Sequence, residues 1–336
     1  MKTRKSFRKG IFYAVLIVLG YACTQEELID LPRENDTLSL SASKKDAIVK
    51  ATTTNFEVGT LYSIYAMIEG STDWKQSIWK PNPKACTEAD DNTINYGDAV
   101  SLGMKNVDFY GVTYDSKTKT INATDYISSD PTKIKIMPDN GTNKFGDLMY
   151  SNNLKSRNSS DGILQMNFKH VMSKIQFTIY KDEKKFSPEK RIFDKAKLTY
   201  IKIKTSGGAV FNVLDGTWSD REAQKTIAHL TNASLLLENS AQNIPGETLF
   251  IPNDEAVQIT VELTDVKNLK TGTLITPEPI TYTVPNKDTG TSFFKFLANH
   301  QYTLSIAVFQ EMGEIIIAFD PTVESWKDKN IDVGET

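Results

Sequence analysis

Two cysteines are the residues of this 336-residue chain best suited to covalent chemistry. A thiol can be acylated, can bind a metal or can form a disulfide, and its neighbours decide which. Cys23 directly follows an apolar run, whereas Cys86 lies far away in sequence, with no CxxC pair and no nearby histidine. This spacing argues against a metal or redox site built on cysteine, and we expect no cofactor.

The residues before Cys23 have the order of a secretory signal peptide. Lysines and arginines are clustered in the first nine positions, an apolar run covers residues 11–19, and small residues follow near Ala22. The run is shorter than the roughly 20 residues that a membrane-spanning helix needs. We therefore predict that residues 1–22 are a signal peptide.

The position of Cys23 resembles the lipobox of bacterial lipoproteins, although Gly20 stands where the lipobox usually has leucine. In such proteins the thiol receives fatty acyl chains such as palmitate, and each buried methylene contributes about 0.8 kcal/mol to membrane binding. We predict Cys23 as the lipid-attachment site and residues 23–36 as a tether. The alternative is a chance cysteine beside an ordinary signal-peptidase site. With Cys23 acylated, Cys86 has no intramolecular disulfide partner.

After residue 36 the apolar residues mostly alternate with polar ones, which is the period of a half-buried β-strand. Leu38, Leu40 and Ala42 alternate in this way, as do the apolar residues between Val257 and Leu263. Turn residues such as Asp215-Gly216 separate many short segments of this kind. The pattern predicts an all-β protein made of β-sandwiches.

The length of the chain favours two domains. Between Phe168 and Ile175 the apolar positions change from even to odd, which indicates a turn or a bulge. The polar stretch Lys181–Lys190 follows and is typical of a linker. We predict an N-terminal sandwich over residues 37–182 and a C-terminal sandwich over residues 183–336.

The composition and the polar residues argue against several functions. The formal net charge is −3, with no basic stretch in the predicted domains, so no nucleic-acid partner is expected. His170, His229 and His300 are far apart in sequence, and the acidic residues between 88 and 91 lack the pattern of a calcium loop. We predict no metal site and no catalytic site, and we interpret the acidic cluster as a solvated surface.

Trp74 and Trp79 could stack against sugar rings, as in a glycan-binding protein. Their odd spacing places them on opposite faces of an extended segment. We prefer one tryptophan in the core and one at the surface over a binding platform.

Six segments, taken in order, resemble the fimbrillin-like lipoproteins of Bacteroidetes, the group of the FimA- and Mfa-type pilins. They are VDFYGVTY (107–114), DLMYS (147–151), LQMNFKHVMSKIQFTI (164–179), LFIPN (249–253), NHQYTLSIAV (299–308) and VESWKD (323–328). The resemblance implies two tandem β-sandwich domains of transthyretin-like Greek-key type. It also implies a surface-exposed lipoprotein of the cell outer membrane, without enzymatic activity, that serves in cell adhesion as a pilus (fimbrial) subunit or as a pilus-associated anchor or tip protein.

The same resemblance implies assembly by donor-strand exchange with other pilin subunits. In that mechanism a trypsin-like protease removes the first strand, and a neighbouring subunit fills the vacated groove by β-augmentation. The displaceable strand would contain Leu38, Leu40 and Ala42. The donor would come from the C-terminal stretch, with Ile315, Ile317 and Phe319 as candidates, or from the tail after Trp326.

Cleavage has to follow Ala42 if it is to free this strand, which leaves Lys44, Lys45 and Lys50 as candidate sites. Arg33 precedes the strand, so a cut there would sever only the tether. The family's best-known shaft pilins are cut at an arginine, and an uncleaved anchor subunit therefore fits the sequence as well. A further alternative is a monomeric cell-surface lipoprotein that binds glycans as its surface ligand.

Overall fold

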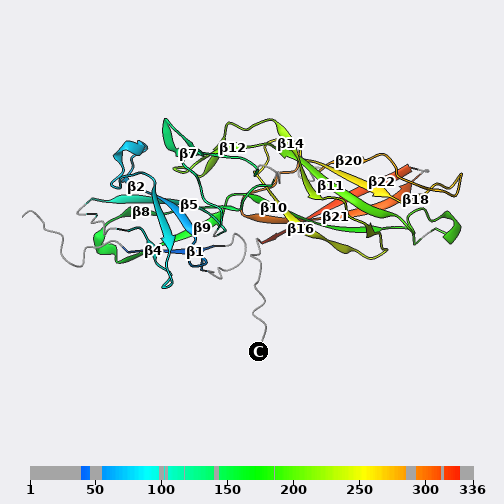
Figure 1. Ribbon diagram of the computed structural model, residues 1–336, viewed down its shortest axis with the longest axis horizontal. Helices are drawn as coiled ribbons and strands as arrows, with labels where there is room; N and C mark the ends of the chain where they lie inside the picture. Colours follow the sequence, from blue (N-terminus) through cyan, green and yellow to red (C-terminus); the bar gives the residue numbers. More distant parts are fainter. Residues whose placement is uncertain are drawn as a thin grey trace, which may run out of the picture.

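The computed structural model describes residues 39–45, 55–97, 102, 105–116, 118–139, 144–184, 186–284, 293–311 and 314–325. These residues form β-strands joined by turns and by the short 3-10 helices η1 (Trp74–Gln76), η2 (Ser159–Asp161) and η3 (Pro188–Lys190), and they contain no α-helix. The predicted all-β class is therefore confirmed (Figure 1).

A seven-stranded sheet forms the N-terminal half. Its strands, in spatial order, are β1 (Ser39–Lys44), β9 (Ile163–His170), β8 (Leu148–Arg157), β5 (Val107–Tyr114), β2 (Leu61–Ile68), β3 (Lys84–Glu88) and β4 (Ile94–Asn95). The pair of β1 and β9 is parallel, and the other pairs are antiparallel. An isolated bridge between Ser41 and Thr93 brings the first strand close to the opposite edge, so the sheet curls around its core.

Two further sheets form most of the C-terminal half. The first has the order β16 (Gln242–Phe250), β10 (Ser173–Lys181), β21 (His300–Glu311) and β22 (Glu314–Ser325). The second has the order β14 (Gln224–Leu230), β11 (Lys197–Ser206), β17 (Gln258–Thr264) and β20 (Ile280–Thr283), with β15 (Leu235–Leu236) also on β11. A small hairpin joins β18 (Val266–Lys267) to β19 (Leu274–Ile275). Buried residues of both sheets, such as Phe177 and Ile203, belong to one hydrophobic core.

A fourth sheet joins the halves. It contains β13 (Thr217–Ser219), β12 (Ala209–Asn212), β7 (Asp130–Ile136) and β6 (Tyr126–Ile127). The pairing of β7 with β12 connects segments from both sides of the predicted boundary at residue 182. In Figure 1 β7 and β12 lie on the upper side of the elongated molecule, above the N-terminal strands β5 and β9 and next to the C-terminal sheets on the right.

The chain passes from the seven-stranded sheet to the C-terminal sheet at Val171 and Met172, between β9 and β10. The change of apolar phase noted in the sequence falls at this passage, because the even positions of β9 and the odd positions of β10 each face a core. The division at residues 182 and 183 into two sandwiches of transthyretin-like topology stays a prediction.

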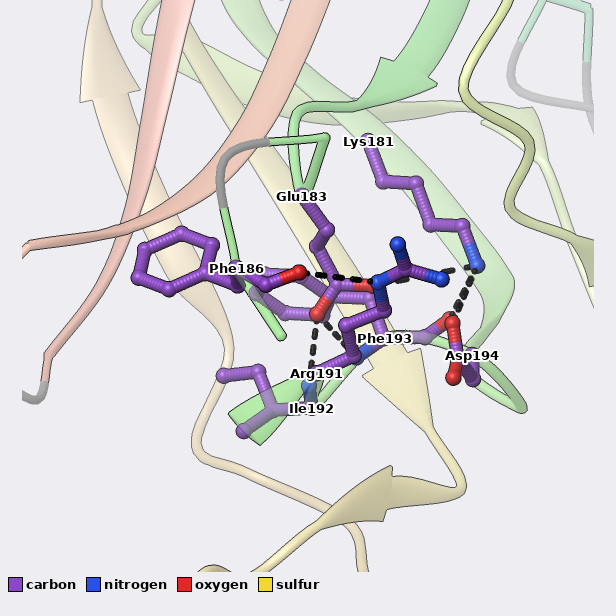
Figure 2. Close-up of polar contacts among 7 residues, drawn as sticks. All are labelled: Lys181, Glu183, Phe186, Arg191, Ile192, Phe193 and Asp194. Atoms are coloured by element: carbon purple, nitrogen blue, oxygen red, sulfur yellow. Dashed lines mark hydrogen bonds and ion pairs between the residues drawn. The ribbon is translucent and has the colours of Figure 1, made fainter. Parts of the chain in front are cut away.

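The segment interpreted as a linker is bonded to the C-terminal half. The backbone N–H groups of Lys181 and Asp182 donate to the carbonyl groups of Glu238 and Val308. Figure 2 shows the side chain of Glu183 directed at the backbone N–H groups of Ile192 and Phe193, at 2.5 and 2.8 Å from Oε1. Since these bonds close the loop on itself, the polar sequence here forms a fixed turn between β10 and β11.

Candidate functional site

Strand β1 lies at the edge of the seven-stranded sheet and pairs with β9 over six consecutive residues, from Ser39 opposite Ile163 to Lys44 opposite Phe168. Leu40 and Ala42 are 0% and 2% exposed and belong to the N-terminal core. The alternation of serine with apolar residues in this segment produces this arrangement, because successive side chains of a strand point to opposite faces.

The other long side of β1 has a single backbone contact within the described residues. It is the antiparallel bridge between Ser41 and Thr93, next to β4. Removal of β1 would therefore open a groove between β9 and the end of β4. The floor of that groove would be the apolar residues that now contact Leu40 and Ala42.

Polar contacts fix the C-terminal end of β1. The Ser43 hydroxyl donates to Asn167 Oδ1 at 3.1 Å, and the Lys45 backbone N–H donates to the Phe168 carbonyl at 2.8 Å. Lys44 Nζ lies 2.7 Å from Asp115 Oδ1, and the two side chains are 12% and 24% exposed. Such a partly buried ion pair is screened by solvent less than a surface pair.

An aromatic cluster lies below the same end of the strand. Phe56 packs edge-on against Tyr62 and Phe168, with ring centroids 5.4 Å apart in each pair. The Lys44 ammonium lies 5.3 Å from the centroid of the Phe56 ring, a cation–π geometry. The chain that leaves the sheet at Lys45 thus returns to the core at Phe56. A cut between these two residues would leave Phe56 as the first buried residue among those that the structure describes.

Glu88 corrects one interpretation made from the sequence. The acidic cluster was expected to be a solvated surface, but Glu88 is 2% exposed and accepts a hydrogen bond from the Tyr62 hydroxyl at 2.7 Å. Burial raises the pKa of this carboxyl group. Its position in β3 on the inward side explains the error, since spacing along the chain does not show which face of a hairpin is covered.

Comparison with protein families assigns this fold. A family model described as fimbrillin-like matches residues 49–326. The chain belongs to the fimbrillin-like family. No match was found among curated protein sequences.

Solved structures support the fold of this fimbrillin-like chain. A fimbrial protein of Bacteroides vulgatus has a TM-score of 0.57 and 15% identity, over 86% of this chain and 99% of that one. A protein of Bacteroides uniformis described as a candidate cell adhesion protein has a TM-score of 0.52 and 15% identity, over 88% and 100%. At such identities the likeness shows a shared fold and no more.

The residues predicted for strand exchange in the fimbrillin-like chain are placed as follows. Leu40 and Ala42 are part of β1 and belong to the N-terminal core, and the role of this strand as a displaceable one stays a prediction. Lys44 lies inside that strand and is paired with Asp115, so its peptide bond is held in the sheet. Cys23, Leu38 and Lys50 lie outside the described residues.

The predicted donor residues lie in β22, the other edge strand of interest. β22 pairs with β21 along its whole length, with Ile315 opposite Gln310, Ile317 opposite Val308 and Phe319 opposite Ile306. It has no second strand partner among the described residues. Separation of β22 from the sheet would break the β21–β22 ladder and would leave β21 as the edge strand.

Three polar residues near β1 were not found from the sequence. Asp115 follows β5 in a polar stretch, and nothing in its spacing relates it to Lys44. Asn153 accepts from the Asn167 backbone N–H at 2.8 Å and donates to the Gln165 carbonyl at 2.9 Å. Its side chain thereby takes the place of a ladder partner where β8 and β9 separate. Alternation in β9 could have suggested only that Asn167 faces outward.

Two other residues considered as functional candidates from the sequence, Trp79 and Cys86, are buried. Trp79 is 2% exposed and stacks on Tyr96, while Trp74 is half-buried, which agrees with one tryptophan in the core. Cys86 is buried, and burial raises the pKa of its thiol to about 12.

Within the part of the chain that the structure describes, no group of three His, Cys, Asp or Glu residues is arranged for a metal ion, and no helix is long and apolar enough to cross a membrane.

Proposed function

We propose that this protein is a non-catalytic fimbrial subunit, or a fimbria-associated anchor or tip protein, that assembles by strand exchange. The observation that carries the proposal is the attachment of β1. Among the described residues the strand is an edge whose only ladder is the parallel one with β9, and it buries the apolar side chains of Leu40 and Ala42 in the core that it covers. Membership of the fimbrillin-like family supports a role among other fimbrial subunits at the cell surface.

The energetics of β1 favour replacement over simple loss. Burial of one leucine contributes about 1.5 to 3 kcal/mol, and each ladder hydrogen bond adds roughly 1 kcal/mol. A subunit without β1 would expose this apolar surface and the unpaired edge of β9. A strand from a second subunit would cover the apolar surface again and would restore the ladder hydrogen bonds with β9. The open groove is therefore a strong binding site. Since each subunit has one groove and one donor, repetition produces an open filament.

The donor in this proposal is the C-terminal stretch, either the Ile315, Ile317 and Phe319 register of β22 or residues nearer the tail. The protease cuts after Lys45 or Lys50, since Lys44 is inside the ladder. The tether carries its lipid at Cys23 and holds the precursor on the outer membrane.

Limited digestion of the purified precursor with trypsin tests the proposal. We expect a defined cut between Lys45 and Phe56, followed by ladders of oligomers that resist heating in detergent. Sequencing of the new N-terminus locates the cut. A complete cut that leaves only monomers contradicts assembly by strand exchange.

The lipid anchor has its own test. Cys23→Ala is expected to release the protein from membranes, measured by the fraction that sediments with them. A variant that still sediments would show that Cys23 does not attach the anchor.

One observation favours the alternative of glycan binding. A hollow of about 570 Å³ is bordered by Tyr114, Lys119, Asn122 and Lys135, with further threonine and aspartate side chains. The hydroxyl, amide and amine groups around this hollow can hydrogen-bond a saccharide. Titration of the uncleaved monomer with acidic and neutral oligosaccharides tests this function, with Lys135→Ala as the variant that should weaken binding.

A further inference from the structure

The loop that follows β10 brings one amine and two carboxyl groups together. Lys181 Nζ lies 3.3 Å from Asp194 Oδ1 and 3.8 Å from Glu183 Oε2. The Lys181 amine also donates to the Phe193 carbonyl at 3.1 Å, so its direction is fixed. Figure 2 shows the ends of the Lys181 and Asp194 side chains directed at each other. An amine and a carboxyl group held in this way are the two halves of an amide bond.

Burial separates this group from an ordinary surface ion pair. The side chains of Lys181 and Glu183 are 8% and 2% exposed, whereas Asp194 is about half exposed. Lys197 Nζ lies closer to its own partner, 2.9 Å from Asp265 Oδ2, but those two side chains are 39% and 37% exposed. Water therefore solvates the amine of Lys197, and it has little access to the amine of Lys181.

Glu183 has one oxygen left for proton transfer. Its Oε1 accepts hydrogen bonds from the backbone N–H groups of Ile192 and Phe193, which fix the carboxyl group in the loop. Its Oε2 is buried and has no hydrogen-bond partner among the described residues, and this oxygen is the one 3.8 Å from Lys181 Nζ. A buried acceptor without a donor is unusual in a folded protein. A carboxylate placed beside an amine can take up its proton and pass it on.

We propose that Lys181 and Asp194 condense to an amide cross-link within the folded chain, with Glu183 as the group that carries the protons. The reaction starts from the ammonium and the carboxylate. Glu183 passes one proton from Lys181 Nζ to an oxygen of Asp194, and the nitrogen lone pair then forms a bond to Asp194 Cγ. A second proton follows through Glu183 to the same oxygen, the bond from Cγ to that oxygen breaks, and one water molecule leaves. The two opposite charges disappear together, Glu183 returns to its starting form, and no oxidant, reductant or cofactor is required.

The fixed positions of the two groups favour this condensation. In dilute solution an amine and a carboxylate do not condense, because water is in large excess and hydrates both ions. Two groups held in reacting geometry behave as if each met the other at about 10⁵ to 10⁸ M. Burial acts in the same direction, since it disfavours the separate charges relative to a neutral amide. Each chain reacts once with itself, which is compatible with a subunit that has no enzymatic activity.

The cross-link would join the two large sheets of the C-terminal half. Lys181 is the last residue of β10, and Asp194 lies shortly before β11, which belongs to the other sheet. A covalent bond here closes a loop over residues 181–194 and restrains the unfolded chain, as a disulfide does. Within the described residues Cys86 is a free thiol, so the amide would give this sandwich a covalent link that reducing agents do not open.

Peptide mapping of the purified full chain tests the inference. The protein is denatured before digestion with trypsin, so that every free lysine is open to cleavage. We expect a branched peptide in which residues 175–184 are attached to residues 192–195, because trypsin does not cut after an acylated lysine. Its mass should equal the sum of the two peptides less one water molecule. The pair of Lys197 and Asp265 is the internal control and should appear only in unjoined peptides.

Three variants assign the roles of the residues. Lys181→Arg keeps the positive charge without this amine, and Asp194→Ala removes the carboxyl group, so each should abolish the branched peptide. Glu183→Gln keeps an oxygen that can accept from the two N–H groups but carries no proton between the reacting groups. It should slow the growth of the branched fraction after synthesis at least about a hundredfold. Glu189→Gln changes an exposed carboxyl group of the same loop and should leave this rate unchanged.

The wild-type protein decides the inference whatever the variants do. A digest in which residues 175–181 form a separate peptide that ends in free Lys181, without any branched product, overturns it. A branched peptide that persists in Asp194→Ala shows that another carboxyl group reacts and overturns the assignment of Asp194. Cross-linking of Glu183→Gln at the wild-type rate excludes Glu183 as the proton carrier. None of these measurements depends on the removal of β1, so strand exchange is tested separately.

Discussion

The edge strand β1 and the loop from Lys181 to Asp194 both contain a largely buried lysine that is paired with a carboxylate. In β1, Lys44 contacts Asp115, which lies in a distant part of the sequence. In the loop, Lys181 Nζ lies 3.3 Å from Asp194 Oδ1 and 3.8 Å from Glu183 Oε2 (Figure 2). Both segments are polar in sequence, and both are fixed in the structure.

The strand β1 and the loop differ in whether the groups that bind them lie outside or inside the segment. The groups that hold β1 belong to β9, to Asp115 and to the core, so another segment with the same pattern can satisfy them. Glu183 instead binds the backbone of its own loop, and Lys181 Nζ donates to the Phe193 carbonyl at 3.1 Å. No external strand can replace such contacts. The comparison teaches that two equally ordered segments can differ in whether the groups that hold them lie inside or outside the segment, and only the second arrangement is compatible with the proposed exchange.

The largest expected loss of stability follows from a substitution in the loop from Lys181 to Asp194. Glu183→Ala removes the acceptor of two buried N–H groups and leaves Lys181 with one carboxylate fewer. We expect the free energy of unfolding of the C-terminal half to fall by about 3 to 5 kcal/mol, as for other broken buried pairs. Urea unfolding measures it, with the exposed Glu189→Ala as a control that should change stability by less than about 0.5 kcal/mol. Equal effects from both variants would contradict the fixed character of the loop.

Leu40→Ala should act on β1 alone. Loss of a fully buried leucine costs about 2 to 5 kcal/mol, and we expect this as easier opening of β1 without unfolding of the C-terminal half. Hydrogen exchange of the β1 amides and the rate of proteolysis after Lys45 measure the opening. Ser41→Ala changes a residue on the outward face and serves as the control. If Leu40→Ala lowers the stability of both halves equally, β1 is not a separable unit.

A fall in pH should lower the free energy of unfolding of the C-terminal half, because His229 is buried without a charge. This residue is buried, its Nδ1 lies 2.9 Å from the Thr248 hydroxyl, and burial lowers its pKa from 6.5 to about 4. The unfolded chain therefore binds the proton more readily, so stability is lost as the pH falls below 6.5. At about 1.4 kcal/mol per pKa unit, the loss reaches about 2 kcal/mol by pH 5.

Unfolding measured at pH 7 and at pH 5 checks this effect. His229→Gln has no ionisable group and should remove this part of the acid sensitivity. An unchanged difference between the two pH values in the variant would show that other groups cause it.

The smallest effect concerns Ser43. Ser43→Ala removes the hydrogen bond to Asn167 and should make opening of β1 easier by about 1 kcal/mol. Hydrogen exchange of the same strand measures it, with Ser39→Ala as the matched control. A loss as large as that of Leu40→Ala would mean that polar contacts, rather than core burial, hold the strand.

The sequence by itself determined the strands and much of the fold. Alternation located β17 and the inward side chains Leu40 and Ala42, because side chains of a strand point to opposite faces. The change of phase after Phe168 located the passage between two sheets. The order of six segments indicated the fimbrillin-like family that the comparisons show.

Only the tertiary structure decided the partners of those strands. The contact of Lys44 with Asp115, the burial of Glu88 and the closure of the loop by Glu183 join residues whose spacing in sequence carries no signal. The physical reason is that alternation reports which side of a strand is apolar, whereas the identity of the neighbour depends on how distant strands align. The proposed exchange of β1 belongs to this second class, since the proposal rests on which groups hold the strand.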